Sequence, residues 1–517
     1  MRLPLASLFL LCCAAQAAEF SLRVVDERGA IAPCRVHLRD ADDKAVQPPG
    51  LPFWADHFVC DGQAKLKLAP GEYHYEIERG PEHESQRGDL KMVADGENKL
   101  AVTVRRFADL AHEGWWSGET HIHRPAGLGA RPLSLEEVKS EIALHVRAED
   151  LHIAPVITWW NQRNFWKSTP LPSGDAAERV DGDRFFNLLA GEDERGGGAL
   201  LFFNLRQPID LPAGGPAHPE YPSSKTFLEA AKRESGAWVD VEKPFWLDAP
   251  MWFASGLVDS VGIANNHMHR SGVGDKEAWG RARNREKFPA PHGNGLWTQE
   301  IYYHLLECGV RLPPSAGSAS GVLPNPVGYN RAYVQLEGPL TWEKWWDGLR
   351  AGRVFVTNGP LLRVRANGEW PGHIFKIAEG EPLHVKLAAV LDGRDPMSQV
   401  EIIKNGHVER RVPVSELRRS DGSLGEITFD QSGWFLVRVI ADVPETFRFA
   451  STGPFYVEAA KQPQRVSRQS AQFFADWMHE RIAGLKLDDP TQREEALRPM
   501  REAEAWWQKK VESATAD

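Results

Sequence analysis

The stretch Trp115–Pro125 reads WWSGETHIHRP and opens the longest of the regions into which this sequence divides. His121 and His123 in it are separated by one apolar residue. On a β-strand, residues i and i+2 face the same side, so both imidazoles would project together while Ile122 points the other way. Two imidazoles side by side can chelate one divalent ion. The same pattern also fits a strand with one polar face, so the motif alone leaves both interpretations open.

The region around this motif, residues 107–360, alternates apolar runs with helical segments. Runs such as APVITWW, ALLFFNL and VDSVGIANN alternate with stretches such as LSLEEVKSEIALHVRAEDL and SSKTFLEAAKRES. Serial strand and helix units indicate parallel strands, most simply a β/α barrel. In such barrels the chemistry gathers where strands end and loops begin, and the histidines and carboxylates here lie at or just after the apolar runs.

The regions on either side of this predicted barrel show the short alternating runs typical of β-sandwiches. Residues 18–106 contain FSLRVVDERGAIAPCRVHLRD and AKLKLAPGEYHYEIERGPE, which predict pairs of strands across turns. Residues 361–459 include a hairpin turn at Asn405-Gly406 and suggest an Ig-like sandwich. Residues 460–517 have helical periodicity and predict a tail packed on the barrel or the sandwich. We therefore expect a multidomain α/β plus β fold with a distorted barrel between two sandwiches.

Length, composition and charge exclude several classes of protein. A chain of 517 residues is too long for one core and predicts three or four domains. The formal net charge is −10 and no block of lysine or arginine stands out, which argues against a nucleic-acid or polybasic membrane partner. Beyond the first residues no segment is apolar over the length of a transmembrane helix, so we expect no membrane span.

Nineteen tryptophans are many, and they cluster around the histidine-bearing middle of the chain. Examples are WW at 115–116, TWWN at 158–161 and KPFW at 243–246. Aromatic walls of this kind suit a pocket for a ring or a sugar, but they suit a large buried core as well. The composition alone favours the core.

The first residues, MRLPLASLFLLCCAAQAAEF, have the pattern of a secretory signal peptide. Arg2 precedes an apolar run, Leu3–Ala15, and the small-residue site Ala15-Gln16-Ala17 predicts cleavage after Ala17. Residues 1–17 are therefore the predicted signal peptide, and we expect an exported protein, periplasmic or extracellular.

Cleavage of the signal peptide would leave Cys34, Cys60 and Cys308. Cys34 and Cys60 lie in the same N-terminal region, and export into an oxidising compartment would allow a disulfide between them. Cys308, in LLECGV, fits a buried thiol better than a nucleophile.

Several motifs of the central region resemble a known family. WWSGETHIHRP, with Glu119 two residues before His121, resembles the opening acid-x-H-x-H strand of the PHP (polymerase and histidinol phosphatase) metallohydrolases. AEDLHIAPVITWWN, SAGSASGVLPNPVGYNRAYV and GRVFVTNGPLL are similar to segments of the CehA/McbA branch, the carbaryl-hydrolase-like PHP proteins, over roughly residues 110–362. The resemblance implies a PHP-like distorted β/α barrel. It also implies a divalent metal cluster that activates water against an amide, ester, carbamate or phosphate bond.

The resemblance assigns the first metal ligands. His121 and His123 fit the first metal pair of the family, and Glu192, in LLAGEDERGG, fits a later acidic ligand. The alternative for Glu192 is a solvated loop, because Asp193 and Glu194 make this stretch a run of charges.

Three later motifs depart from the family pattern. Residues 158–161 read TWWN where the family has Thr-Asp-His-Asn, and residues 242–244 read EKP where it has His-Pro. Residues 317–321 read GSASG where it closes with Gly-Ser-Asp-x-His. Each replacement removes a ligand that the resemblance implies, so we expect one or two ions (Zn, Mn or Fe) rather than three.

Other oxygen and nitrogen ligands lie close to the lost positions. Glu242 stands where the family has histidine, and Asp240 shares its strand face. His267 and His269 form a second H-x-H pair after an apolar run, and His267 is the favoured further ligand. Asp240 or His269 would then carry the proton in catalysis. Four further candidates fit structural roles at least as well: His145, Asp150, His152 and the pair Glu300/His304.

These assignments predict an exported metal-dependent hydrolase of a small-molecule substrate. Arg331 or Lys243 would hold an anionic group of the substrate, and Trp160 would contact it. The alternative is a catalytically degenerate PHP-like barrel that acts as a secreted glycan- or peptide-binding protein. The replaced ligands favour this alternative, whereas the retained histidines and the acid at Glu242 favour the enzyme.

Overall fold

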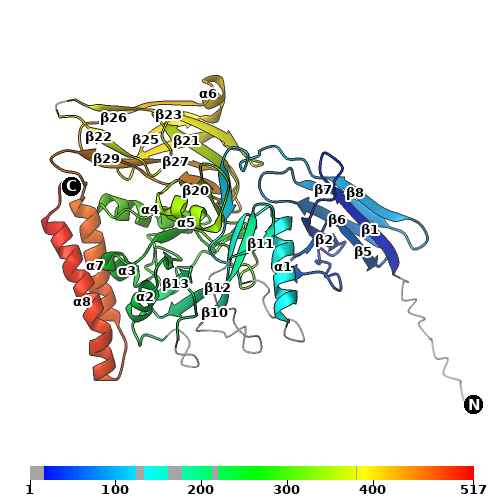
Figure 1. Cartoon of the computed structure of the whole chain (residues 1–517), viewed down its shortest axis with the longest axis horizontal. Helices are drawn as coiled ribbons and strands as arrows, with labels where there is room; N and C mark the ends of the chain where they lie inside the picture. Colours follow the sequence, from blue (N-terminus) through cyan, green and yellow to red (C-terminus); the bar gives the residue numbers. More distant parts are fainter. Residues whose placement is uncertain (1–16, 124–132, 161–176, 212–218, 380) are drawn as a thin grey trace, which may run out of the picture. The chain divides into compact units, whose positions relative to one another are not determined.

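The computed structural model describes residues 17–123, 133–160, 177–211, 219–379 and 381–517 (Figure 1). The chain forms two compact units, one of residues 1–79 with 84–106 and the other of residues 80–83 with 107–517. Of the predicted signal peptide, residues 1–16 lie outside the described part of the chain.

The N-terminal unit is built from two sheets with a shared core. One sheet has the order β5-β1-β8 and the other the order β3-β4-β2-β6-β7. The strand bounds are β1 Ala18–Val25, β2 Cys34–Asp40, β3 Phe53–Trp54, β4 His57–Cys60, β5 Gln63–Leu68, β6 Gly71–Glu78, β7 Gln86–Met92 and β8 Asn98–Thr103. In β5, buried and exposed residues alternate, so its apolar side chains all face the core. Phe20, Val36 and Phe58 join both sheets in one apolar core, which gives the unit a sandwich-like form.

Cys34 and Cys60 face each other across the antiparallel pair β2/β4 of this unit. Both are buried thiols, and their Sγ atoms lie 3.7 Å apart.

The second unit is a mixed α/β structure around a long sheet. From one edge, this sheet has the order β18-β15-β14-β13-β12-β10-β9-β19-β20-β28-β27-β24-β25. Its first seven strands are β18 Pro314–Ala316, β15 Ser260–Ala264, β14 Trp238–Val241, β13 Gly198–Phe203, β12 Arg184–Arg195, β10 Ile153–Trp160 and β9 Trp115–Gly118. Strands β9, β10 and β12 run parallel, as do β14, β15 and β18, whereas β12, β13 and β14 alternate in direction.

The described residues do not form the closed, parallel barrel that the sequence suggests. One reason is the connection between β12 and β13, which consists of Gly196 and Gly197 alone. A connection this short can join only antiparallel strands. The segments that follow β9 and β18 do meet, through the bridge Ile122↔Ser320 and the hydrogen bond from Thr120 N to Ala316 O. The first seven strands therefore curve around a common centre without a continuous closing ladder.

The helices of this region cover the sheet and connect its strands. They are α1 Leu135–Ala148, α2 Ser224–Lys232, α3 Ala249–Ser255, α4 Gly293–Glu307 and α5 Trp342–Arg350. Helix α1 begins at a capping box in which Ser134 and Glu137 bond each other's backbone amides. It connects the parallel strands β9 and β10, as the strand and helix periodicity predicts.

The predicted C-terminal sandwich shares its sheet with the central region. Strand β20 pairs with β28, so the long sheet continues into β27, β24 and β25, and a second sheet, β21-β23-β26, packs over it around a common core. The strands of this part are β19 Arg331–Gln335, β20 Val354–Thr357, β21 Leu361–Ala366, β22 Ile374–Ile377, β23 Leu383–Asp392, β24 Gln399–Lys404, β25 His407–Pro413, β26 Ser423–Phe429, β27 Gly433–Ile440, β28 Phe449–Thr452 and β29 Phe455–Ala459. The smaller elements of the unit are β11 Glu178–Asp181, β16 Met268–His269, β17 Gly272–Val273 and α6 Val414–Arg419. The hairpin predicted at Asn405-Gly406 is confirmed.

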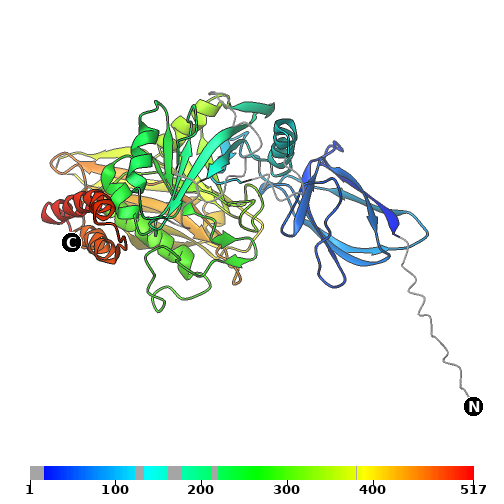
Figure 2. The same cartoon turned by 90° about the horizontal axis from the view of Figure 1, so that it is seen from below.

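The C-terminal tail is a pair of helices, α7 Arg468–Gly484 and α8 Pro490–Glu512, which lie side by side (Figures 1 and 2). Trp507 in α8 stacks on Phe474 in α7 at 4.4 Å between ring centroids, and its Nε1 donates to the backbone oxygen of Pro250 in α3. The tail thus packs on the helices of the central region. Most of the largest fully buried side chains are tryptophans: Trp115, Trp238, Trp252, Trp345, Trp434, Trp477 and Trp507. For these residues the core interpretation of the tryptophans is confirmed.

Candidate metal centre

Three of the predicted ligands converge in the interior of the second unit. His121 and His123 lie in the extended segment after β9, and Glu192 lies near the end of β12. His121 Nε2 is 2.9 Å from His123 Nε2, and Glu192 Oε2 is 3.6 Å and 3.0 Å from these two atoms. The exposed fractions of the three residues are 2%, 3% and 4%. The stretch around Glu192 is therefore a buried strand and not the solvated loop that its charges also suggested.

The arrangement fits a divalent cation. Zinc binds histidine nitrogen at about 2.0–2.1 Å, so two ligand atoms at bond angles between 90° and 110° lie roughly 2.9–3.4 Å apart. The three separations bracket that range, and the ligand atoms all lie within 4.8 Å of one another. Glu192 Oε2 is buried and makes no hydrogen bond. Three lone-pair donors that face one point repel each other unless a proton or a cation lies between them.

The electrostatics of the group also favour a positive charge. Burial lowers the pKa of His121, but the carboxylates of Glu192 and Glu242 outweigh burial and raise it to about 10. Burial alone would raise the pKa of Glu192, but His121 and His123 hold it well below its usual range. The two carboxylates therefore favour a positive charge at this site, which a protonated His121 provides when no other cation is present.

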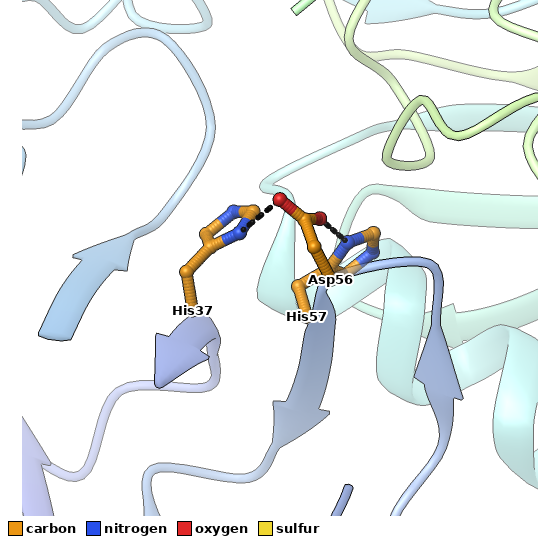
Figure 3. Close-up of side chains that lie close together, drawn as sticks. All are labelled: His37, Asp56 and His57. Carbon is orange, nitrogen blue, oxygen red and sulfur yellow. Dashed lines mark hydrogen bonds and ion pairs between the residues drawn. The ribbon is translucent and has the colours of Figure 1, made fainter. Parts of the chain in front are cut away.

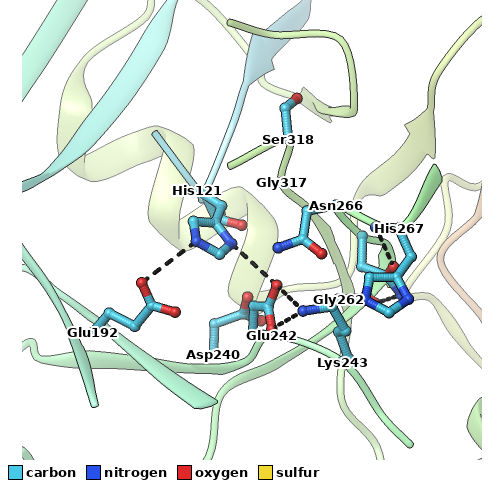
Figure 4. A network of polar contacts seen from close by, with 12 residues as sticks. His121, Glu192, Asp240, Glu242, Lys243, Gly262, Asn266, His267, Gly317 and Ser318 are labelled. Carbon is cyan, nitrogen blue, oxygen red and sulfur yellow. Dashed lines mark hydrogen bonds and ion pairs between the residues drawn. The ribbon is translucent and has the colours of Figure 1, made fainter. Parts of the chain in front are cut away.

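Glu242 faces the other nitrogen of His121. Its Oε1 lies 3.3 Å from His121 Nδ1, and both of its oxygens lie close to Lys243 Nζ, at 2.6 and 2.5 Å (Figure 4). Trp246 Nε1 donates a further hydrogen bond to Oε2, at 3.1 Å. Glu242 thus lies beside the three ligand atoms but does not belong to the group that converges on one point.

Asp240 lies on β14 two residues before Glu242, so the two side chains project to the same side of the extended chain. Its Oδ1 accepts hydrogen bonds from the hydroxyls of Ser260 and Ser315, both at 2.6 Å. Burial raises the pKa of Asp240 to about 6, although the two hydroxyls oppose this.

Three other predicted site residues lie outside the group. His267 lies beyond Lys243 as seen from His121 (Figure 4), and burial, followed by the charge of Lys243, lowers its pKa to about 3. His269 lies in the short strand β16, and burial lowers its pKa. Arg331 is buried on β19, where it donates to the backbone oxygens of Gly328 and Glu149. The structure thus gives Arg331 backbone partners in place of a substrate.

Trp160, at the end of β10, flanks the group. Its ring centroid is 5.1 Å from that of His123, and its side chain is only partly buried. The replacement of a metal ligand by TWWN therefore places an aromatic ring against one of the histidines.

Two features of the site were not predicted from the sequence. The Asn266 side chain points toward the space between His121 and Glu242 (Figure 4), and its buried Oδ1 makes no hydrogen bond. Gly317 lies so close to His121 that a Cβ at this glycine would be 2.3 Å from His121 Cβ. Asn266 lies two residues after the end of β15. Polar residues just after a strand are candidates for site residues, so this position could have been predicted from the sequence. No sequence signal points to Gly317.

Glu119 connects the histidine segment to the loops after β18. Its carboxylate accepts hydrogen bonds from the backbone amides of Ser318 and Gly328. Burial raises the pKa of Glu119 to about 7, against the effect of these amides. The acid of the acid-x-H-x-H motif therefore fixes the backbone instead of facing the ligand atoms.

A second group with metal-ligand chemistry lies in the N-terminal unit and consists of His37, Asp56 and His57 (Figure 3). The Nδ1 atoms of both histidines lie 3.2 Å from oxygens of Asp56. Arg35 Nε donates to His37 Nε2, so in the neutral ring the proton is on Nδ1 and points at the carboxylate. Arg39 Nη2 also donates to Asp56, at 3.0 Å. This pattern fits a network of charged hydrogen bonds better than a metal site.

The remaining histidines and acids singled out in the sequence have structural partners. Asp150 pairs with Arg184, and His152 Nδ1 lies 2.8 Å from Ser117 Oγ. His145 is buried in α1. His304 Nδ1 lies 2.9 Å from Ser470 Oγ.

Comparisons with protein-family models, curated proteins and solved structures find no match to this chain. In the described residues, no helix combines the length and the apolar character needed to cross a membrane.

Proposed function

We propose that this protein is an exported, metal-dependent hydrolase with one catalytic centre at His121, His123 and Glu192. The observation that carries the proposal is the convergence of their three ligand atoms within 4.8 Å in the protein interior. The sequence resemblance to the CehA/McbA branch of the PHP metallohydrolases supports it independently. The curved arrangement of β9 to β18 agrees with a distorted, PHP-like barrel without a closing ladder.

The residues present define a division of roles. His121, His123 and Glu192 would hold a divalent ion (Zn, Mn or Fe). Such an ion would lower the pKa of a water molecule toward ~7 and polarise the bond that is cleaved. Glu242 Oε1 lies 3.3 Å from His121 Nδ1 and would orient the ring, as carboxylates next to metal-bound histidines do. Asp240, with Oδ1 held by two serines, is the proposed proton acceptor.

The charges around the site favour an uncharged substrate. Lys243 is bound to Glu242, and Arg331 donates to the backbone oxygens of Gly328 and Glu149, so both predicted cations already have partners within the protein. An ester, amide or carbamate therefore fits better than a phosphoester. Asn266 offers an amide to such a carbonyl group, and Trp160 offers an aromatic surface beside His123.

The test combines elemental analysis of the purified protein with an activity screen over esters, amides, carbamates and phosphoesters. Wild type should contain a divalent metal and hydrolyse a carbonyl substrate, and His121→Ala should lose both properties. The exposed His479→Ala serves as the control for loss of a histidine. Metal content and activity that do not change in His121→Ala would contradict the proposal. A protein that contains no metal but binds a glycan or peptide would support the degenerate barrel instead.

A further inference from the structure

The pair Glu242–Lys243 lies on the Nδ1 side of the His121 ring. The two nitrogens of the His121 ring face two different carboxylates: Nε2 lies 3.6 Å from Glu192, and Nδ1 lies 3.3 Å from Glu242. Only one of these nitrogens can bind an ion in a neutral imidazole, because the other carries the proton. Nε2 belongs to the converging group, so a His121 that binds the ion carries its proton on Nδ1, 3.3 Å from Glu242 Oε1.

The remaining lone pairs of Glu242 are also occupied. Lys243 Nζ contacts both carboxylate oxygens, at 2.6 and 2.5 Å, and Trp246 Nε1 donates to Oε2. A second ion that used Glu242 as a ligand would have to displace the ammonium group and the indole hydrogen bond.

Lys243 itself is fixed in this position. Its exposed fraction is 4%, and its Nζ lies 4.4 Å from the centroid of the Trp246 ring, in cation–π distance. Transfer of a buried ammonium group to another position is costly unless it finds a new partner. The ammonium group is therefore held beside Glu242 by its contacts with the carboxylate and the Trp246 ring.

We propose that Lys243 occupies the place of a second cation and makes the centre mononuclear. Glu242 then acts as a positioning residue for His121, and Lys243 keeps that carboxylate away from a second ion. This inference rests on the proposed function, because it requires the ion at His121, His123 and Glu192.

The experiment counts bound ions in the full-length protein. The chain is freed of metal with a chelator, titrated with Mn²⁺ and followed by calorimetry, elemental analysis and electron paramagnetic resonance. Wild type should bind one Mn²⁺ per chain with the spectrum of an isolated ion. Lys243→Met should bind a second Mn²⁺ and show spin coupling between the two ions. Glu242→Gln should still bind one ion, with an affinity about 10–100-fold lower, as for other residues that orient metal ligands.

Lys287→Met is the matched control, since Lys287 also pairs with a carboxylate, Glu300, and lies over an aromatic ring, Phe288, but on the surface. It should bind Mn²⁺ as wild type does. Two coupled ions in wild type, or a folded Lys243→Met chain with one ion at unchanged affinity, would overturn the inference. An unchanged affinity of Glu242→Gln would overturn the positioning role. A wild type that binds no Mn²⁺, or a His121→Ala chain that binds it normally, would refute the proposed function as well.

Discussion

The Nε2 atoms of His121 and His123 lie 2.9 Å apart in the interior of the protein, and Glu192 Oε2 lies 3.6 Å and 3.0 Å from them. Two neutral imidazole nitrogens at this distance are joined either by a hydrogen bond or by a cation that both of them bind. The negative charge of the neighbouring Glu192 carboxylate favours a bound cation. Because cation binding requires all three ligand atoms to converge, a substitution that shifts one imidazole ring by about 1 Å should weaken cation binding strongly.

Gly317→Ala should weaken metal binding through such a shift. A Cβ at this position would be 2.3 Å from His121 Cβ, so the histidine must move. Overpacking of this kind costs about 1–3 kcal/mol of stability, and we expect at least a tenfold loss of metal affinity. Gly272→Ala is the control, since a Cβ there meets no atom within 4 Å. Calorimetric metal titration and urea unfolding measure both effects, and equal affinities of the two variants would contradict the expected shift.

Asn266→Ala should separate catalysis from metal binding. If its amide contacts the carbonyl oxygen of the substrate, as its direction in Figure 4 suggests, its loss should lower kcat by about 10²–10³-fold, as for other hydrogen-bond donors to a developing oxyanion. The number of bound ions should stay the same. Steady-state kinetics and elemental analysis of the same preparation test this. An unchanged kcat would exclude the proposed contact.

Arg481→Met should destabilise the second unit without any change at the metal centre. Arg481 in α7 donates to Asp248 at 2.7 Å and to Glu220, and its side chain is 4% exposed. Removal of one partner leaves the buried Asp248 carboxylate uncompensated, which typically costs about 3–5 kcal/mol.

The matched control is Arg501→Met, whose pair with Glu494 lies on the surface, is screened by solvent and should contribute little to stability. Urea unfolding of both variants gives the comparison. Similar losses in the two variants would show that the Arg481 network does not anchor the helical tail.

Acid should destabilise the contact between α4 and α7 through His304. The ring stacks on Phe473 at 4.4 Å between centroids, and burial lowers its pKa to about 4, against the opposing charge of Glu300. Between the unfolded pKa of ~6.5 and a folded pKa of about 4, the unfolded chain binds a proton that the folded chain does not. The contribution of His304 to the free energy of unfolding is therefore fully present above pH ~6.5 and decreases as the pH falls. At pH 5 the loss is roughly 2 kcal/mol.

His304→Gln should lose less stability than wild type between pH 7 and pH 5, whereas the exposed His479→Gln should lose as much as wild type. Urea midpoints at the two pH values measure the difference. The same acid dependence in wild type and His304→Gln would show that another group is responsible.

The sequence predicts the part of the site that depends on the periodicity of an extended chain. His121 and His123 project together because the segment is extended and its side chains alternate, as the i, i+2 spacing requires. The same-side projection of the two histidines depends only on local geometry, which the sequence encodes directly. Glu192 is expected as a ligand from the resemblance to the PHP metallohydrolases, because its run of charges alone also fits a solvated loop.

The partners of the other residues depend on the fold and could not be read from the sequence. Lys243 turns toward the neighbouring Glu242, and Arg331 turns toward Glu149 O from a distant part of the chain. Neither direction follows from strand alternation. The direction of β13 was also unpredictable from apolar runs alone, because a Gly-Gly turn converts one parallel crossing into a hairpin. The described strands of the central region are therefore not all parallel.

The most direct test of the metal centre is anomalous diffraction from crystals grown with Zn²⁺. We expect one peak at about 2.0–2.2 Å from His121 Nε2, His123 Nε2 and Glu192 Oε2. A peak at His37, Asp56 and His57 instead, or no peak beside His121, would contradict it.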